Sequence, residues 1–167
     1  MTLASETCGP RFAADDRARP SPVGASTLPA AAYRASRMVR FSDCDSAGIV
    51  YTPRYVDMLN GVIEDFFPAA LGLDYHGFIT AGIGLGYASL QCDFFQPARM
   101  GEFLSITPLI DRIGGASAGF ILHAHRGEDE VFRGRLTMVT TAIEAGRPIP
   151  LPAPIRAALT RYQEQCQ

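Results

Sequence analysis

The sequence predicts an α+β fold in which one long helix packs against a strongly curved antiparallel sheet. One stretch, which begins near residue 52, repeats apolar residues at three- and four-residue steps, as an amphipathic helix does. Four stretches of strand-like composition follow it, separated by turns rich in glycine or proline. A helix followed by consecutive strands indicates the α+β class.

The size and charge of the chain fit one globular domain with an appendage. It has 167 residues, of which 47% are hydrophobic and 19% are charged. The net charge of −2 favours neither nucleic acid nor an anionic membrane surface as a partner. There is no apolar run long enough to span a bilayer and no apolar core of a signal peptide, so we expect a cytoplasmic protein.

Composition divides the chain into two parts. Residues 1–32 are rich in Ala, Pro, Ser, Arg and Asp without periodicity, and are predicted to be a flexible tail. Residues 33–167 are predicted to form the folded domain. A first strand is expected through Met38, Val39 and Phe41, ending at an acidic pair.

The helix is the clearest predicted element. Thr52 is suited to be its N-cap and Pro53 its first helical residue, because proline lacks the N–H that would be left unbonded there. Pro68 and Gly72 are expected to end it. Its predicted apolar face consists of Tyr55, Met58, Leu59, Val62, Ile63 and Phe66.

Four strands are predicted after the helix, over residues 83–95, 103–113, 116–126 and 131–144. The dipeptide Gly114-Gly115 is typical of a tight hairpin between the second and third of these strands. A short closing helix is expected over residues 154–163.

The cysteines and histidines form no recognisable metal-binding spacing. They include no Cys-x-x-Cys pair, so we expect reduced thiols and no metal site. These residues are Cys8, Cys44, Cys92, Cys166, His76, His123 and His125.

An acidic pair just before the helix indicates chemistry on a carbonyl group. Asp43 and Asp45 lie a few residues before Thr52, and Gly48, between Asp45 and Thr52, permits a tight return of the chain. Free N–H groups and the positive dipole end of a helix start can hold an oxyanion. A lone Asp before a helix is more often a cap or turn residue, but Thr52 already supplies the predicted cap.

The same segment resembles a known enzyme family. The stretch Asp43-Cys44-Asp45-Ser46-Ala47-Gly48-Ile49-Val50-Tyr51 is similar to the Asp-Cys-Asp-Pro-Ala-Gly-Ile-Val signature of the Pseudomonas-type 4-hydroxybenzoyl-CoA thioesterases. These are acyl-CoA hydrolases of the hot-dog fold. Residues 95–102 and 147–152 also resemble turns of that superfamily, and the likeness runs from Val39 to the C-terminus. Ser46 departs from the usual proline.

The resemblance implies a hot-dog fold, with a long central helix wrapped by about five antiparallel strands. It implies that Asp45 is the catalytic carboxylate and that the N–H near Thr52 polarises the thioester carbonyl. It further implies a homodimer or homotetramer with active sites between subunits, CoA phosphates that meet surface arginines, and no cofactor.

Several roles remain open. Asp45 could be a nucleophile that forms a mixed anhydride, or a base for an attacking water. Asp43 could orient the loop or lie exposed, and His76 could be a base near the acyl group or an ordinary loop residue. Glu64 is expected on the solvated face of the helix. The candidate substrate-binding residues are Asp43, Gly48, Ile49, Tyr51, Tyr55, His76 and Arg99.

The expected function is hydrolysis of an aryl- or medium-sized acyl-CoA, similar to 4-hydroxybenzoyl-CoA, to the carboxylic acid and free CoA. One alternative is a thioesterase that acts on acyl carrier protein thioesters. The dehydratases of this fold usually place a histidine near the helix start, and residues 40–55 contain none. Another alternative is a non-catalytic module that binds acyl-CoA.

Overall fold

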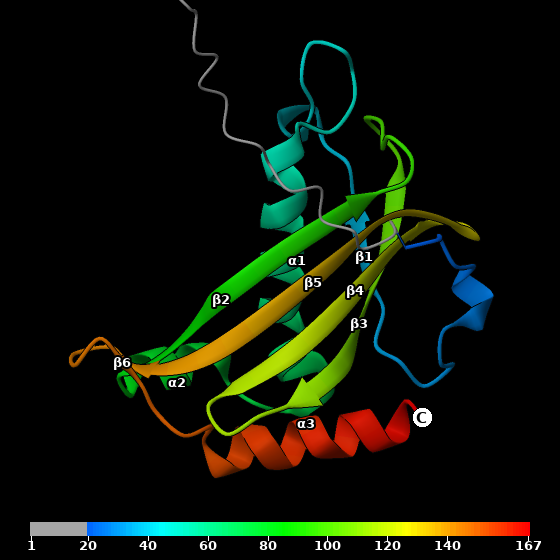
Figure 1. Cartoon of the computed structure of the whole chain (residues 1–167). Helices are drawn as coiled ribbons and strands as arrows, with labels where there is room; N and C mark the ends of the chain where they lie inside the picture. Colours follow the sequence, from blue (N-terminus) through cyan, green and yellow to red (C-terminus); the bar gives the residue numbers. More distant parts are fainter. Residues whose placement is uncertain (1–19) are drawn as a thin grey trace, which may run out of the picture.

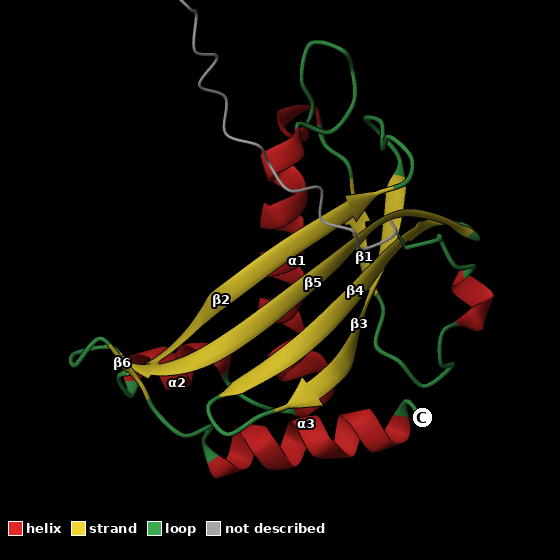
Figure 2. Cartoon of the chain, in the orientation of Figure 1, coloured by secondary structure: helices red, strands yellow, loops and turns green. Residues whose placement is uncertain are grey.

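One antiparallel sheet curves around a long helix in the computed structural model, which describes residues 20–167 (Figures 1 and 2). Five strands of the sheet follow the order β1-β3-β4-β5-β2, and a sixth, β6, pairs with β5. The predicted hairpin strands are confirmed, while β2 crosses over to pair with β5. The strands are β1 (Ala35–Met38), β2 (Ile83–Phe94), β3 (Phe103–Ile113), β4 (Ser117–Arg126), β5 (Asp129–Ala142) and β6 (Arg147–Pro148).

The central helix α1 (Thr52–Phe66) crosses the concave face of this sheet. Of the two residues predicted to end the helix, Gly72 does so, whereas Pro68 lies inside a π-helical turn (Phe67–Leu71) that continues the helix. That turn accommodates a residue without an N–H, and Gly72 then reverses the chain with φ of 66°.

The apolar face of α1 and the inner face of the sheet form the core. Alternate residues of β4 and β5 point towards the helix, which is why Phe120, Leu122 and Phe132 are almost completely buried. The buried helix residues are Tyr55, Leu59, Val62, Ile63 and Phe66, which confirms the predicted stripe except at the partly exposed Met58.

A glycine in β5 sets how closely α1 approaches the sheet. A Cβ atom at Gly134 would lie 2.4 Å from Leu59 Cδ1, a distance that atoms cannot adopt without movement. Leu59 is itself completely buried. The helix therefore rests on the strand backbone at this point.

The structure corrects three sequence predictions. β1 stops at Met38, because Phe41–Asp43 forms a 3₁₀ turn in which the Asp43 carboxylate accepts the Arg40 N–H. A short helix, α2 (Tyr75–Thr80), replaces the loop expected around His76. The strand β6 was not predicted.

The C-terminal helix α3 (Ala153–Gln165) packs beside β3 and extends beyond the predicted range at both ends. Its Tyr162 hydroxyl donates to Pro108 O at 2.8 Å and accepts the Tyr33 N–H at 2.9 Å. This buried hydroxyl ties the start of the domain to β3. No helix within residues 20–167 has the length and apolar character needed to cross a membrane.

The described part of the predicted tail is bound to the sheet. The Val23 N–H donates to Glu130 at 2.8 Å, and the Ser21 carbonyl accepts from Arg133 at 3.0 Å. Residues 25–27 form a 3₁₀ turn beside Glu128. Residues 20–27 are therefore held against the sheet, which differs from the predicted flexible tail. Residues 1–19 of that predicted tail lie outside the described range.

This N-terminal segment covers a buried ionic cluster on the outer, convex face of the sheet. The Glu130 carboxylate accepts from His123 Nδ1 at 2.7 Å, from Arg133 at 2.8 and 2.5 Å, and from the Val23 N–H. Burial lowers the pKa of His123 although Glu130 opposes this shift. Burial would raise the pKa of Glu130, but its hydrogen bonds, led by that from Arg133, lower it.

We predict that Gly134→Ala destabilises the protein, because the added methyl group would force Leu59 and α1 away from β5. Overpacking of this kind costs about 1–3 kcal/mol. Urea unfolding followed by circular dichroism measures the loss. Gly86→Ala in β2 is the control, since a Cβ there meets no atom within 4 Å. Equal effects of the two substitutions would contradict the close packing.

We also predict that stability falls on acidification. An unfolded chain protonates histidine near pH 6.5, whereas His123 in the folded state resists protonation, so the unfolded state binds more protons below about pH 6.5. Glu130 adds a second loss below about pH 4.3 for the same reason. The measurement is the free energy of unfolding between about pH 7.5 and 4.

The variant His123→Asn should remove the first decline, and the exposed His76→Asn should retain it. An unchanged slope between about pH 7.5 and 5.5 in His123→Asn would refute this assignment.

Candidate active site

The acidic pair lies in a tightly folded loop, residues 43–50, which we name the acid loop. Its backbone closes on itself, since the Asp45 N–H donates to Ile49 O at 2.9 Å and the Gly48 N–H donates to Asp45 O at 3.0 Å. Gly48 has φ of 72°, a conformation that favours glycine. The Tyr51 N–H donates to Asp43 O at 2.8 Å, which brings the end of the loop back to its start.

The two aspartates have different local roles. Asp43 Oδ2 accepts the Arg40 N–H at 2.7 Å and so holds the preceding 3₁₀ turn. Asp45 Oδ1 accepts the Ala47 N–H at 2.8 Å, which fixes the carboxyl group within the loop. No described residue donates a hydrogen bond to Asp45 Oδ2, and the side chain is exposed. This oxygen can therefore interact with a ligand or water.

The helix start differs from the prediction by one position. Thr52 is the first helical residue rather than the N-cap, which is Tyr51, and Tyr51 forms no side-chain cap. The Arg54 N–H donates to Tyr51 O at 2.8 Å, and Pro53 has no N–H. Among residues 20–167 no acceptor faces the Thr52 N–H, which leaves it as a donor at the positive end of the helix dipole.

Two hollows lie at this end of the molecule, and the acid loop contributes to both. Thr52 and Tyr55 line a hollow of about 380 Å³, together with Ile49, Val50, Phe94, Phe95, Gln96 and Pro97. Asp45 lines a hollow of about 550 Å³, together with Phe41, Cys44, Ser46, Gly48, Arg99 and Met100. Within one chain, the carboxylate and the helix start therefore occupy neighbouring hollows and not the same one.

Most of the predicted substrate-binding residues gather here. Gly48, Ile49, Tyr55 and Arg99 each line one of the hollows, and Ile49 pairs with Arg99 in an isolated β-bridge. Asp43 and Tyr51 bracket the acid loop.

His76 does not join this group within one chain. It lies exposed in α2, beyond the far end of α1. Since α1 rises about 1.5 Å per residue over 15 residues, its two ends are roughly 20 Å apart. The predicted acyl-binding role of His76 thus requires a second subunit.

Three other arginines are already engaged with acidic or carbonyl groups. Arg135 pairs with Asp93 at 2.8 Å, Arg133 pairs with Glu130, and Arg126 pairs with Glu102. Glu64, expected in solvent, is half-buried and accepts a 2.6 Å hydrogen bond from Asn60.

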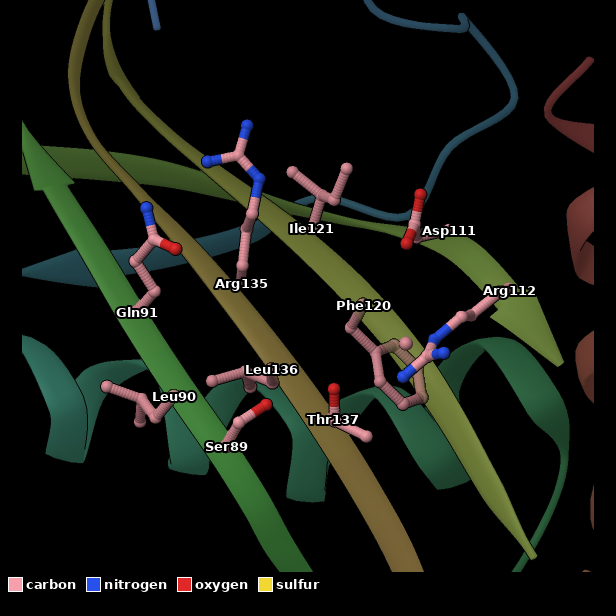
Figure 3. Close-up of a pocket in the computed structure, with 11 residues that line it drawn as sticks. Ser89, Leu90, Gln91, Asp111, Arg112, Phe120, Ile121, Arg135, Leu136 and Thr137 are labelled. Atoms are coloured by element: carbon pink, nitrogen blue, oxygen red, sulfur yellow. The ribbon is translucent and has the colours of Figure 1, made fainter. Parts of the chain in front are cut away.

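A third hollow, of about 540 Å³, lies on the face of the sheet away from α1 (Figure 3). Arg135, Gln91 and Thr137 project from β5 and β2 on this face, opposite to the neighbouring core residue Leu136. This hollow is far from the acid loop in the fold, on the outer surface of the sheet.

The contribution of Phe94 and Gln96 to the hollow at the helix start was not predicted. The sequence feature that could have indicated it is the turn at residues 95–102, because this turn follows β2, whose end lies beside α1. The sequence alone does not show that this strand pairs with β5, which is what brings its end to Tyr55.

Comparison with known proteins identifies the family. The model of the thioesterase-like superfamily matches residues 39–159. This chain belongs to the thioesterase-like superfamily. The match begins before the acid loop and includes α1 and all the long strands after it.

A curated relative is a 1,4-dihydroxy-2-naphthoyl-CoA hydrolase from Crocosphaera subtropica. It is 31% identical over 72 residues, which make up 42% of this chain and 52% of the relative. The aligned part therefore spans about half the length of that protein.

Solved structures establish the hot-dog fold. A 1,4-dihydroxy-2-naphthoyl-CoA thioesterase from Synechocystis has a TM-score of 0.71 at 23% identity, covering 77% of this chain and 95% of its own. A gentisyl-coenzyme A thioesterase has a TM-score of 0.71 at 23% identity, over 76% and 99% of the two chains. A Staphylococcus aureus protein in complex with CoA has a TM-score of 0.75 at 12% identity, over 81% and 86%. The predicted fold is confirmed, and specificity for 4-hydroxybenzoyl-CoA stays a prediction.

Proposed function

We propose that this protein is an acyl-CoA thioesterase that hydrolyses an aryl-CoA ester to the carboxylic acid and free CoA. The observation that carries the proposal is a carboxylate oxygen of Asp45 that has no partner within residues 20–167, one loop away from the Thr52 N–H at the helix start, which has no acceptor in the same range. Membership of the thioesterase-like superfamily supports thioester chemistry at this site.

The chemistry needs a nucleophile and a site for the developing oxyanion. As a base, Asp45 takes a proton from water while the water oxygen attacks the thioester carbonyl carbon. The carbonyl oxygen becomes negative and accepts from the Thr52 N–H. The C–S bond then breaks, and the CoA thiolate leaves and recovers the proton.

As a nucleophile, the carboxylate attacks the carbonyl directly and CoA leaves as the thiolate. The resulting mixed anhydride is then cleaved by water, which regenerates Asp45. Both routes need the same placement of the carboxylate, and both remain part of the proposal.

An aryl acyl group is supported by two observations. The hollow at the helix start is lined by the aromatic residues Tyr55, Phe94 and Phe95, which suit a flat apolar group. Two of the structural relatives described above are named for aryl-CoA substrates.

We further propose that a second copy of the chain completes the site by pairing along β2. Within residues 20–167 no strand pairs with the outer edge of β2, although the strand is 12 residues long. Leu90 on its inner face is 40% exposed, and the nearby Tyr87 hydroxyl is buried with no hydrogen-bond partner among the described residues. Long unpaired edges are normally covered, and a dimer would cover this one.

The central test is Asp45→Asn, which preserves the size of the side chain and removes its negative charge. We expect kcat for benzoyl-CoA to fall about 10²–10⁴-fold, because the base or nucleophile is lost. Release of free thiol measures the reaction. The control is Asp57→Asn, an exposed helix residue paired with Arg54, which should retain normal activity. An active Asp45→Asn variant would exclude this role, and a wild type that cleaves no aryl, phenylacyl or straight-chain CoA ester would exclude the function.

For the dimer, we expect sedimentation of the wild type at twice the mass of the chain or more. Leu90→Arg should shift the protein towards the monomer, because a charge would be buried at the β2 edge. Met38→Arg, on β1 at the opposite edge and 45% exposed, is the matched control. A monomeric wild type would contradict the proposed pairing.

A further inference from the structure

The connection between β2 and β3, residues 95–102, contributes to both hollows of the candidate site. Gln96 and Pro97 line the hollow at the helix start, whereas Arg99 and Met100 line the hollow that contains Asp45. We name this segment the β2–β3 link. Its position therefore affects the carboxylate and the helix start together.

On the inner side, a single residue of the link, Ala98, bonds to both the acid loop and α1. The Ala98 N–H donates to the Tyr55 hydroxyl of α1 at 3.2 Å, and the Ala98 carbonyl accepts the Val50 N–H of the acid loop at 2.9 Å. Ala98 is fully buried and Tyr55 is 5% exposed. The acid loop and the first turn of α1 are thus held at a fixed separation through the backbone of Ala98.

The Tyr55 hydroxyl is itself fixed in place by aromatic packing. Its ring lies 5.0 Å from that of Phe94 and 4.7 Å from that of Phe132, measured between centroids. Burial raises the pKa of Tyr55, which keeps the hydroxyl neutral and able to accept from Ala98. The anchor is consequently rigid in both position and protonation state.

On the outer side, a guanidinium group from β4 holds the two ends of the link. Arg126 donates to Gln96 Oε1 at 2.7 Å and to both Glu102 carboxylate oxygens at 3.0 Å. The same Glu102 carboxylate accepts the Arg99 N–H at 2.8 Å. Burial opposes ionisation of Glu102, but the hydrogen bonds from Arg99 and Arg126 lower its pKa. The Arg126 guanidinium, which belongs to β4, therefore bonds to residues at both ends of the link.

We infer that Tyr55 and Arg126 are positioning residues, which clamp the β2–β3 link and thereby set the acid loop against the start of α1. The inference rests on the proposed thioesterase function and deepens it. Tyr55 acts through the backbone of Ala98 on Val50, and Arg126 acts through Glu102 on Arg99, which bridges to Ile49. Neither side chain is required to touch the reacting atoms.

Such a clamp matters because catalysis is sensitive to small displacements of reacting groups. A misplacement of about 1 Å can reduce a rate by about 10²-fold. A displaced acid loop changes the position of the reacting groups, so it should lower kcat more than it raises KM.

The experiment compares two buried tyrosine hydroxyls that each accept a backbone N–H. Tyr55→Phe should lower kcat for the best aryl-CoA substrate by about 10–100-fold with KM changed by less than about threefold. Tyr162→Phe removes the contact to Tyr33, and also the bond to Pro108 O, far from the site, so it should lower the melting temperature at least as much without loss of kcat. If Tyr55→Phe keeps the wild-type kcat, the positioning role is refuted.

A second pair tests the outer anchor. Arg126→Lys removes the two-pronged contact with Gln96 and Glu102 and should lower kcat. Arg156→Lys is the control, because Arg156 holds the Gly114 carbonyl in a distant turn at 2.7 Å. Equal kcat in all four variants would refute the clamp as a whole.

The clamp can also be tested if the proposed thioesterase function is wrong. If the wild type cleaves no thioester, hydrogen exchange at the Val50 amide tests the clamp by itself. Faster exchange in Tyr55→Phe than in Tyr162→Phe would support the hydroxyl as the anchor of the acid loop, and equal exchange would refute it.

Discussion

Burial of the apolar face of α1 in the concave sheet is the constraint on which the rest of the structure depends. The helix can pack closely only because the sheet curves around it and because β5 offers bare backbone at Gly134. Burial of each large side chain in this layer contributes about 1.5–3 kcal/mol. The start of the helix is thereby held at one end of the sheet, where Thr52 lines a hollow and its N–H has no acceptor within residues 20–167.

The candidate site is a consequence of this placement. Because β2 crosses the sheet to pair with β5, its end arrives beside Tyr55, and the link to β3 then passes between the acid loop and the helix. Backbone hydrogen bonds hold most of the acid loop and the β2–β3 link in place, and only a few side chains, such as Tyr55 and Arg126, add to them. The proposed chemistry therefore depends on a segment whose geometry is determined by the sheet.

The sequence predicted the features that depend on local patterns. The stripe of α1, the limits of β3 and the glycine turn of the acid loop all follow from spacing and turn chemistry. It did not predict α2, whose six residues carry little periodicity, or the shortened β1, which Asp43 ends through a side-chain hydrogen bond. The position of His76 and the binding of residues 20–27 depend on long-range contacts that no local pattern encodes.

The contact between Gly134 and Leu59 also makes the volumes allowed at these two positions depend on each other. A larger residue at 134 can be accommodated only if the side chain at 59 becomes smaller, since the summed volume of the pair is fixed by the helix–strand distance. A change at one of the two positions therefore needs a matching change at the other, and alanine at 134 calls for a smaller side chain at 59.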